Sequence, residues 1–148
     1  MTIEEVLNIV MRVLHIVSAI ALLGGAIFFL TTMLPAVRVL DEGLRGSVLQ
    51  LTRKRFYRIT HPALLLLLIT GFYNYIRNMD IYRAAPKAVH GILGTKILLA
   101  LIITVIIFAQ SFGLLKGCPV RWTKVNVALG LVIVVLAAVA RSMRLGAM

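Results

Sequence analysis

Four long apolar runs alternate with shorter segments that are rich in Lys and Arg. The first run, Val13 to Met33, has no charged residue over 21 positions, and the others cover Ile59 to Ile76, Val89 to Leu115 and Val125 to Ala140. A helix needs about 20 mostly apolar residues to cross a bilayer. The pattern therefore predicts an all-α membrane protein, a bundle of four transmembrane helices that forms a single integral membrane domain. The expected spans are about 6–34, 56–78, 88–115 and 122–143.

The segments between the runs are expected to be connections of unequal length. Leu34 and Pro35 predict the end of the first helix, because proline lacks the N–H group and its ring clashes with the preceding turn. A charged connection of about 25 residues would follow it, then one of about a dozen, then one of about nine with Gly117, Cys118 and Pro119. The residues before Val13 are expected to extend the first helix into the membrane interface.

Composition argues against a soluble domain. Hydrophobic residues make up 61% of the chain and the mean hydropathy is +1.00, whereas globular domains are about 45–50% apolar. Sixteen Lys and Arg against five Asp and Glu give a net charge of +11. Because these charges lie between apolar runs, they indicate loops against anionic lipid headgroups and no nucleic-acid partner. The single cysteine, Cys118, excludes an intramolecular disulfide and a zinc site of paired thiolates.

Basic residues are distributed unequally between the two expected faces of the membrane. The first and third connections carry nine: Arg38, Arg45, Arg53, Lys54, Arg55, Arg58, Lys116, Arg121 and Lys124. The opposite face carries six: Arg12, Arg77, Arg83, Lys87, Arg141 and Arg144. The positive-inside rule then places the first and third connections in the cytoplasm and both termini outside. The expected location is a bacterial inner membrane.

Ionisable residues inside the spans are candidates for function, because charges are costly in hydrocarbon. The spans contain His15, His61, His90 and Lys96. The first and third helices run in the same direction, so His15 and His90 are expected near one face of the membrane and His61 near the other.

Helical periodicity predicts where these side chains point. His15 shares one face with Ser18, Leu22 and Gly25, a small-residue stripe that suits close contact with a neighbouring helix, so it is expected to point inward. On the third span, His90 and Gly94 are one turn apart on one face, and Lys96 lies on a different face.

Two imidazoles beside a gap lined by glycine suit haem b, because imidazole is a good iron ligand and the macrocycle needs clearance between helices. We therefore expect His15 and His90 to be axial ligands and His61 to be the alternative second ligand. The propionates would pair with cations predicted on that same side: Arg12, Arg141, Lys87 and Arg144. Lys96 would hold a propionate, bind an anionic substrate or relay protons.

Simpler interpretations exist for each residue. Histidines are common at headgroup level, and Lys96 would reach the surface along its aliphatic stem. His61 precedes Pro62, so it would merely cap the start of the second helix. Met11 and His15 are four residues apart and would bind copper through a thioether and an imidazole. The chain has no phosphate-binding glycine loop, nucleophile elbow or paired carboxylates, so hydrolase chemistry is unsupported.

Three strings in the chain resemble a known family: LHIVSAIALLGGAIFFLTTMLP, RKRFYRITHPALLLLLITGFYNY and GTKILLALIITVIIF. They are similar to the four-helix membrane family that joins the HemJ-type protoporphyrinogen oxidases and the copper-resistance D (CopD) domain. The resemblance implies a haem-binding membrane protein. The oxidase branch is thought to pass electrons from a porphyrinogen toward quinone, and the copper branch is linked to copper entry. His15 and Lys96 match positions that the oxidase pattern usually fills with His and Lys.

The chain departs from the oxidase pattern at two places. Gly94 stands where that pattern has a His two residues before the Lys, and Phe108, Ala109 and Gln110 stand where a further His is usual. Porphyrinogen oxidation itself is therefore not implied. His90 lies one turn from Gly94 on the same face, so the ligand would be shifted by about 6 Å toward the surface.

The leading hypothesis is a haem b protein for electron transfer or oxidoreduction, with a quinone or porphyrin partner. One alternative is a copper or small-solute transporter that uses Met11, His15 and His61. Another is a non-catalytic membrane subunit of a larger complex or a homo-oligomer, in which the histidines bind nothing.

Overall fold

The computed structural model describes residues 2–84, 87–114 and 119–145, and these residues form helices and short turns without a strand. The helical elements are α1 (Ile3–Phe28), the π-helical η1 (Phe29–Met33), α2 (Leu34–Arg38), α3 (Glu42–Arg77), α4 (Met79–Ala84), α5 (Lys87–Ser111) and α6 (Pro119–Leu145). Four stretches are long and apolar enough to cross a membrane: Ile3–Arg38, Glu42–Arg77, Val89–Ser111 and Val120–Met143. The prediction of an all-α membrane protein with four membrane-spanning helices is confirmed. Residues Met1–Tyr75 and Ile76–Met148 form two compact units, which are described separately.

A capping box fixes the start of α1. The Glu5 N–H donates to Thr2 Oγ1 at 3.3 Å, and the Thr2 N–H donates to Glu5 Oε2 at 2.8 Å. This arrangement satisfies donors that the first helical turn leaves without a partner. The expectation that the helix extends before Val13 is therefore confirmed.

The first helix does not end at Pro35 as expected. The chain stays helical to Arg38 through η1, in which the Leu34 N–H donates to the Phe29 carbonyl one residue farther back than in an α-helix. The prediction assumed regular α-helical turns, in which the proline ring clashes with the carbonyl four residues earlier. One widened turn before Pro35 relieves that clash and lets α2 begin with the proline in its first turn.

The predicted connection of about 25 residues is also wrong, because α2 and α3 are separated only by residues 39–41. Arg, Lys, Gln and Leu between Glu42 and Arg58 are good helix formers, and nothing requires a helix to stop at the membrane surface. With 36 residues, α3 is about 54 Å long, against about 30 Å of hydrocarbon. Its basic first half therefore extends beyond the apolar run that begins at Ile59.

The position of Pro62 inside α3 corrects the interpretation of His61 as a helix cap. His61 and Pro62 lie in mid-helix, about 20 residues after the helix begins. His61 therefore does not cap a helix start.

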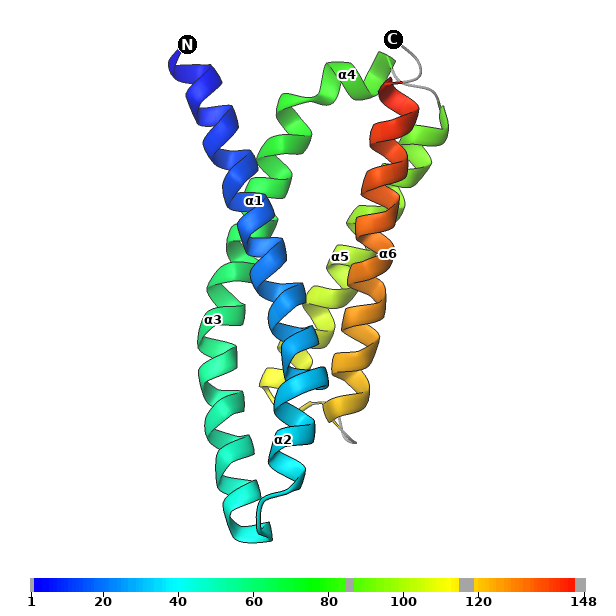
Figure 1. The fold of residues 1–148 in the computed structure, drawn as a ribbon. Coiled ribbons are helices and arrows are strands. Elements are labelled where there is room, and N and C mark those ends of the chain that lie inside the picture. Colours follow the sequence, from blue (N-terminus) through cyan, green and yellow to red (C-terminus); the bar gives the residue numbers. More distant parts are fainter. Residues whose placement is uncertain (1, 85–86, 115–118, 146–148) are drawn as a thin grey trace. The chain divides into compact units, whose positions relative to one another are not determined.

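In the first unit α1 packs antiparallel against α3 (Figure 1). The Tyr73 hydroxyl donates to Asn8 Oδ1 at 2.9 Å near one end of the pair. Toward the other end, the rings of Phe29 and Phe56 stack with centroids 6.2 Å apart. The buried side chains between these contacts include Ser18 and Leu64.

In the second unit α5 and α6 pack as an antiparallel hairpin (Figure 1). Gly113, with φ of +68°, ends α5: the Leu114 N–H donates to the Ala109 carbonyl and the Gly113 N–H to the Gln110 carbonyl. This is a Schellman cap, which favours glycine because residues with a Cβ rarely adopt that φ. The connection that was predicted to hold Gly117 and Cys118 lies outside the described residues.

Candidate functional site

His15 lies on the face of α1 that contacts α3, and its ring is half-buried. On the same face Ser18 is buried, and Gly25 lies against the ring of Phe56. The small-residue stripe therefore forms the helix contact that its spacing predicted, and the expectation that His15 points inward is confirmed.

Two oxygens of α3 hold the His15 ring. Its Nδ1 lies 3.2 Å from the Leu67 carbonyl oxygen and 3.1 Å from Thr70 Oγ1. A carbonyl oxygen only accepts hydrogen bonds, so Nδ1 must carry the proton. The neutral ring then has its lone pair on Nε2, the atom that can bind a metal ion.

Gly71 gives the ring the space it occupies. A Cβ at Gly71 would lie 3.1 Å from His15 Cε1 and 3.6 Å from Nδ1, so even an alanine would push on the ring. We call the Leu67 carbonyl, the Thr70 hydroxyl and Gly71 the histidine seat. It combines hydrogen bonding on one ring atom with close van der Waals contact on the next.

The ring of His61 also donates to a backbone carbonyl, but that carbonyl belongs to its own helix. Its Nδ1 donates to the Tyr57 carbonyl of its own helix at 2.6 Å, and its ring lies 5.7 Å from the Tyr57 ring. The carbonyls that hold the two histidines, at Tyr57 and Leu67, are ten residues apart, which is about 15 Å along α3. Two imidazoles on one metal ion hold their nitrogens about 4 Å apart, twice a bond of about 2 Å. His15 and His61 therefore cannot share a metal ion in this unit.

In the second unit His90 and Gly94 are exposed side by side on one face of α5. A Cβ at Gly91 or Gly94 would meet no heavy atom within 4 Å, so the surface beside His90 is open. The preceding residue, Val89, is buried with 1% of its surface exposed. His90 thus lies at the edge of the buried face of α5, beside the two glycines Gly91 and Gly94.

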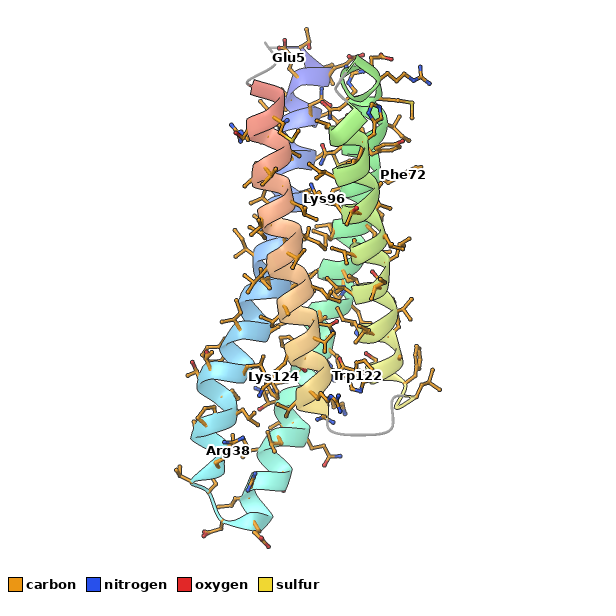
Figure 2. The ribbon with its side chains drawn as sticks, turned by 90° about the vertical axis from the view of Figure 1, so that its right-hand side faces the viewer. Glu5, Arg38, Phe72, Lys96, Trp122 and Lys124 are labelled. Carbon is orange, nitrogen blue, oxygen red and sulfur yellow. The ribbon has the colours of Figure 1, made fainter. Side chains whose placement is uncertain are left out.

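Lys96 lies on the buried face of the same helix. It is seven residues from Val89 and eleven from Ile107, both buried, which places all three within about 20° of one another around the helix. Figure 2 shows Lys96 well away from the end of the hairpin that carries Trp122 and Lys124. The side chain is half-buried. The prediction that His90 and Lys96 occupy different faces is confirmed.

The expected propionate ligands are accessible. Arg12 on α1 and Arg141 on α6 are both exposed. The side chains of Lys87 and Arg144, expected to assist them, lie outside the described residues. Met11, one turn before His15, is half-buried. In the part of the chain that the structure describes, no three His, Cys, Asp or Glu side chains come together as a metal-binding group.

The sequence did not point to Thr70 or to Asn126. Thr70 is 1% exposed and its hydroxyl donates to the Leu66 carbonyl at 2.6 Å, so it looks like an ordinary helix threonine until the neighbouring His15 is seen. Asn126 Oδ1, on α6, is buried without a hydrogen-bond partner among the described residues. A polar residue within a membrane span was the signal available for both.

Residues 9–81 match the family described as predicted integral membrane protein (DUF2269). The matched region contains the α1–α3 pair with His15, His61 and the histidine seat, and it ends before α5. The family description supports an integral membrane protein in contact with the lipid bilayer. The chain has no significant match among curated proteins or among solved structures.

Proposed function

We propose that this protein binds haem b in the membrane and transfers electrons, with His15 as one axial ligand. The observation that carries the proposal is the hydrogen bond from His15 Nδ1 to the Leu67 carbonyl. Histidines that bind metals usually donate their other ring N–H to a carbonyl or carboxylate, which fixes both tautomer and ring orientation. The histidine seat supplies that arrangement inside an apolar helix pair.

The other residues fit a haem better than a compact metal site. Haem needs only one or two axial ligands from the protein, whereas copper or zinc sites are usually built from three or four. The described residues contain no group of three His, Cys, Asp or Glu side chains placed to hold a metal ion. His90 is the proposed second ligand, since the glycine surface beside it has space for a flat group. The resemblance to the HemJ and CopD family supports the same cofactor.

The remaining roles follow from charge and burial. Haem, when bound, supplies one-electron redox chemistry, and the protein sets its potential through ligand identity and burial. The exposed Arg12 and Arg141 would hold propionates. Lys96, half-buried on α5, would hold an anionic group or relay a proton to a quinone or porphyrin partner. The proposed location is a bacterial inner membrane with both termini outside.

The test is a visible spectrum of the purified protein, expressed with haem available, in its air-oxidised and dithionite-reduced states. The proposal expects a Soret band and sharp reduced bands. His15→Ala should remove the band and His90→Ala should abolish the low-spin signature. His61→Ala is the matched control, because His61 is held in the same tautomer but about 15 Å away along α3. That variant should keep the spectrum.

A wild-type protein without a Soret band would overturn the proposal, as would a His15→Ala variant with an unchanged band. Bound copper without haem would favour the transporter that uses Met11, His15 and His61. Isolation with soluble partner proteins and no cofactor would favour a non-catalytic subunit.

A further inference from the structure

We propose that Thr70 is a positioning residue that reinforces the Nδ1–H tautomer of His15, which the Leu67 carbonyl also favours, and thereby favours Nε2 as the ligating atom. The role of Nε2 as a haem ligand rests on the proposed function, but the effect of Thr70 on the tautomer does not. Thr70 belongs to α3 and His15 to α1, so this role exists only in the packed helix pair.

The direction of each hydrogen bond is determined by the geometry of Thr70. Its hydroxyl has one proton, and the Leu66 carbonyl lies 2.6 Å from Oγ1, closer than the Leu67 carbonyl at 3.3 Å. The proton is therefore committed to the helix backbone, and the oxygen lone pairs remain for a donor. That donor is the Nδ1–H of His15, at 3.1 Å. The hydroxyl thus acts as an acceptor toward the histidine.

The burial of Thr70 makes it difficult to move the His15 proton from Nδ1 to Nε2. Thr70 is 1% exposed, so solvent does not compete for its oxygen. A proton on Nε2 would leave the lone pair of Nδ1 facing two oxygens, both of which have lone pairs of their own. An unpaired acceptor in a low-dielectric site is costly. The two acceptors, Thr70 and Leu67, therefore act together on one ring atom.

Two substitutions separate the effect of the Thr70 oxygen on the His15 tautomer from the effect of the Leu67 carbonyl. Thr70→Val keeps the branched shape and removes the acceptor, leaving only the Leu67 carbonyl at 3.2 Å. Thr70→Ser retains the oxygen. If Thr70 only filled space, valine would behave like the wild type. If its oxygen positions the ring, serine would behave like the wild type and valine would not.

The experiment uses the full chain in detergent micelles with ¹⁵N-labelled histidine, without haem, at about pH 8, where an ordinary histidine is neutral. Two-bond ¹H–¹⁵N spectra then show which ring nitrogen carries the proton. His15→Asn assigns the His15 signals. His61 is an internal control, since its Nδ1 is bound to the Tyr57 carbonyl and does not contact the histidine seat.

The proposal expects the Nδ1–H form of His15 in the wild type and in Thr70→Ser, and a measurable share of the Nε2–H form in Thr70→Val, where only the Leu67 carbonyl still favours Nδ1–H. Thr104→Val is the matched control. Thr104 also donates to a carbonyl four residues back, that of Ala100 at 2.8 Å, but it lies on α5 in the other unit. That variant should leave the His15 signals unchanged.

A second measurement links the tautomer to the ligand. Loss of the group that accepts a hydrogen bond from a ligating histidine typically lowers metal affinity about 10- to 100-fold. Haem titration should therefore show about that loss for Thr70→Val, with recovery in Thr70→Ser. An Nε2–H form of His15 in the wild type, or Thr70→Val spectra identical to wild type, would overturn the role of Thr70. A wild type that has the Nδ1–H form but takes up no haem would instead overturn the proposed function.

Discussion

A single methyl group added at Gly25 would test how tightly α1 and α3 pack. An ideal Cβ at Gly25 would lie 2.9 Å from Phe56 Cε2, closer than carbon atoms normally approach. The neighbouring Gly24 would place its Cβ within 4 Å of no heavy atom. Gly24→Ala and Gly25→Ala are therefore the same chemical change at adjacent positions of one helix, with and without a neighbour.

The expected difference in the free energy of unfolding between the two variants follows from two opposing effects. Replacing glycine by alanine inside a helix is favourable by about 1 kcal/mol at both positions. Overpacking costs about 1–3 kcal/mol when the neighbour cannot move freely. The Phe56 ring is held by its stack on Phe29, with centroids 6.2 Å apart, so it cannot yield cheaply. We expect Gly24→Ala to raise the free energy of unfolding by about 1 kcal/mol relative to the wild type. The free energy of unfolding of Gly25→Ala should be about 1–3 kcal/mol lower than that of Gly24→Ala.

The assay is equilibrium unfolding in mixed micelles, with the two variants compared at the same detergent composition. Phe56→Leu supplies the control, because removing the ring should narrow the gap between the two glycine variants. Equal stability of Gly24→Ala and Gly25→Ala would refute the reasoning, since the α1–α3 contact at this level would then be absent.

Three further outcomes are expected. Tyr73→Phe removes the donor to Asn8, and unfolding titrations should show a loss of about 0.6 kcal/mol, the average for hydrogen bonds between membrane helices; an Asn8→Ala background should remove the effect. A Cβ at Gly94 would meet no heavy atom within 4 Å, so the thermal stability of Gly94→Leu without haem should not fall, whereas its haem uptake should fall if the macrocycle occupies that space; unchanged uptake would argue against this. Thr2→Ala breaks the capping box at a cost of about 1 kcal/mol, and hydrogen exchange at the Glu5 amide should speed up, while Thr2→Ser should restore protection.

The apolar pattern was sufficient for the number of membrane spans but not for the lengths of the helices. Hydropathy identifies the part of a helix that lies in hydrocarbon, so the basic segment before Ile59 was interpreted as a loop. The same residues form the first half of α3 because their backbone preference is helical whatever their charge. Pro35 was misinterpreted for a related reason, since the widened turn at Phe29–Met33 has no signature in the residue pattern.

The candidate site was partly predictable. The spacing of His15, Ser18 and Gly25 was enough to infer an inward-facing histidine, because residues on one helical face recur every three or four positions. The partner of that histidine was not predictable. Which residue of α3 lies opposite His15 depends on how far the two antiparallel helices slide past each other. One turn of displacement would bring a different set of side chains to the ring.

This dependence distinguishes the two histidines of the first unit. His61 donates its hydrogen bond to the Tyr57 carbonyl, four residues earlier in the same helix, so its tautomer is fixed wherever α3 is helical. His15 donates to oxygens of another helix, so its tautomer is fixed only while α1 and α3 keep their register. A perturbation that shifts α1 along α3 should therefore disturb His15 and spare His61. The contacts at both ends of the pair, at Gly25 and at Tyr73, thus stabilise the presentation of Nε2 at His15 as well as the helix pair itself.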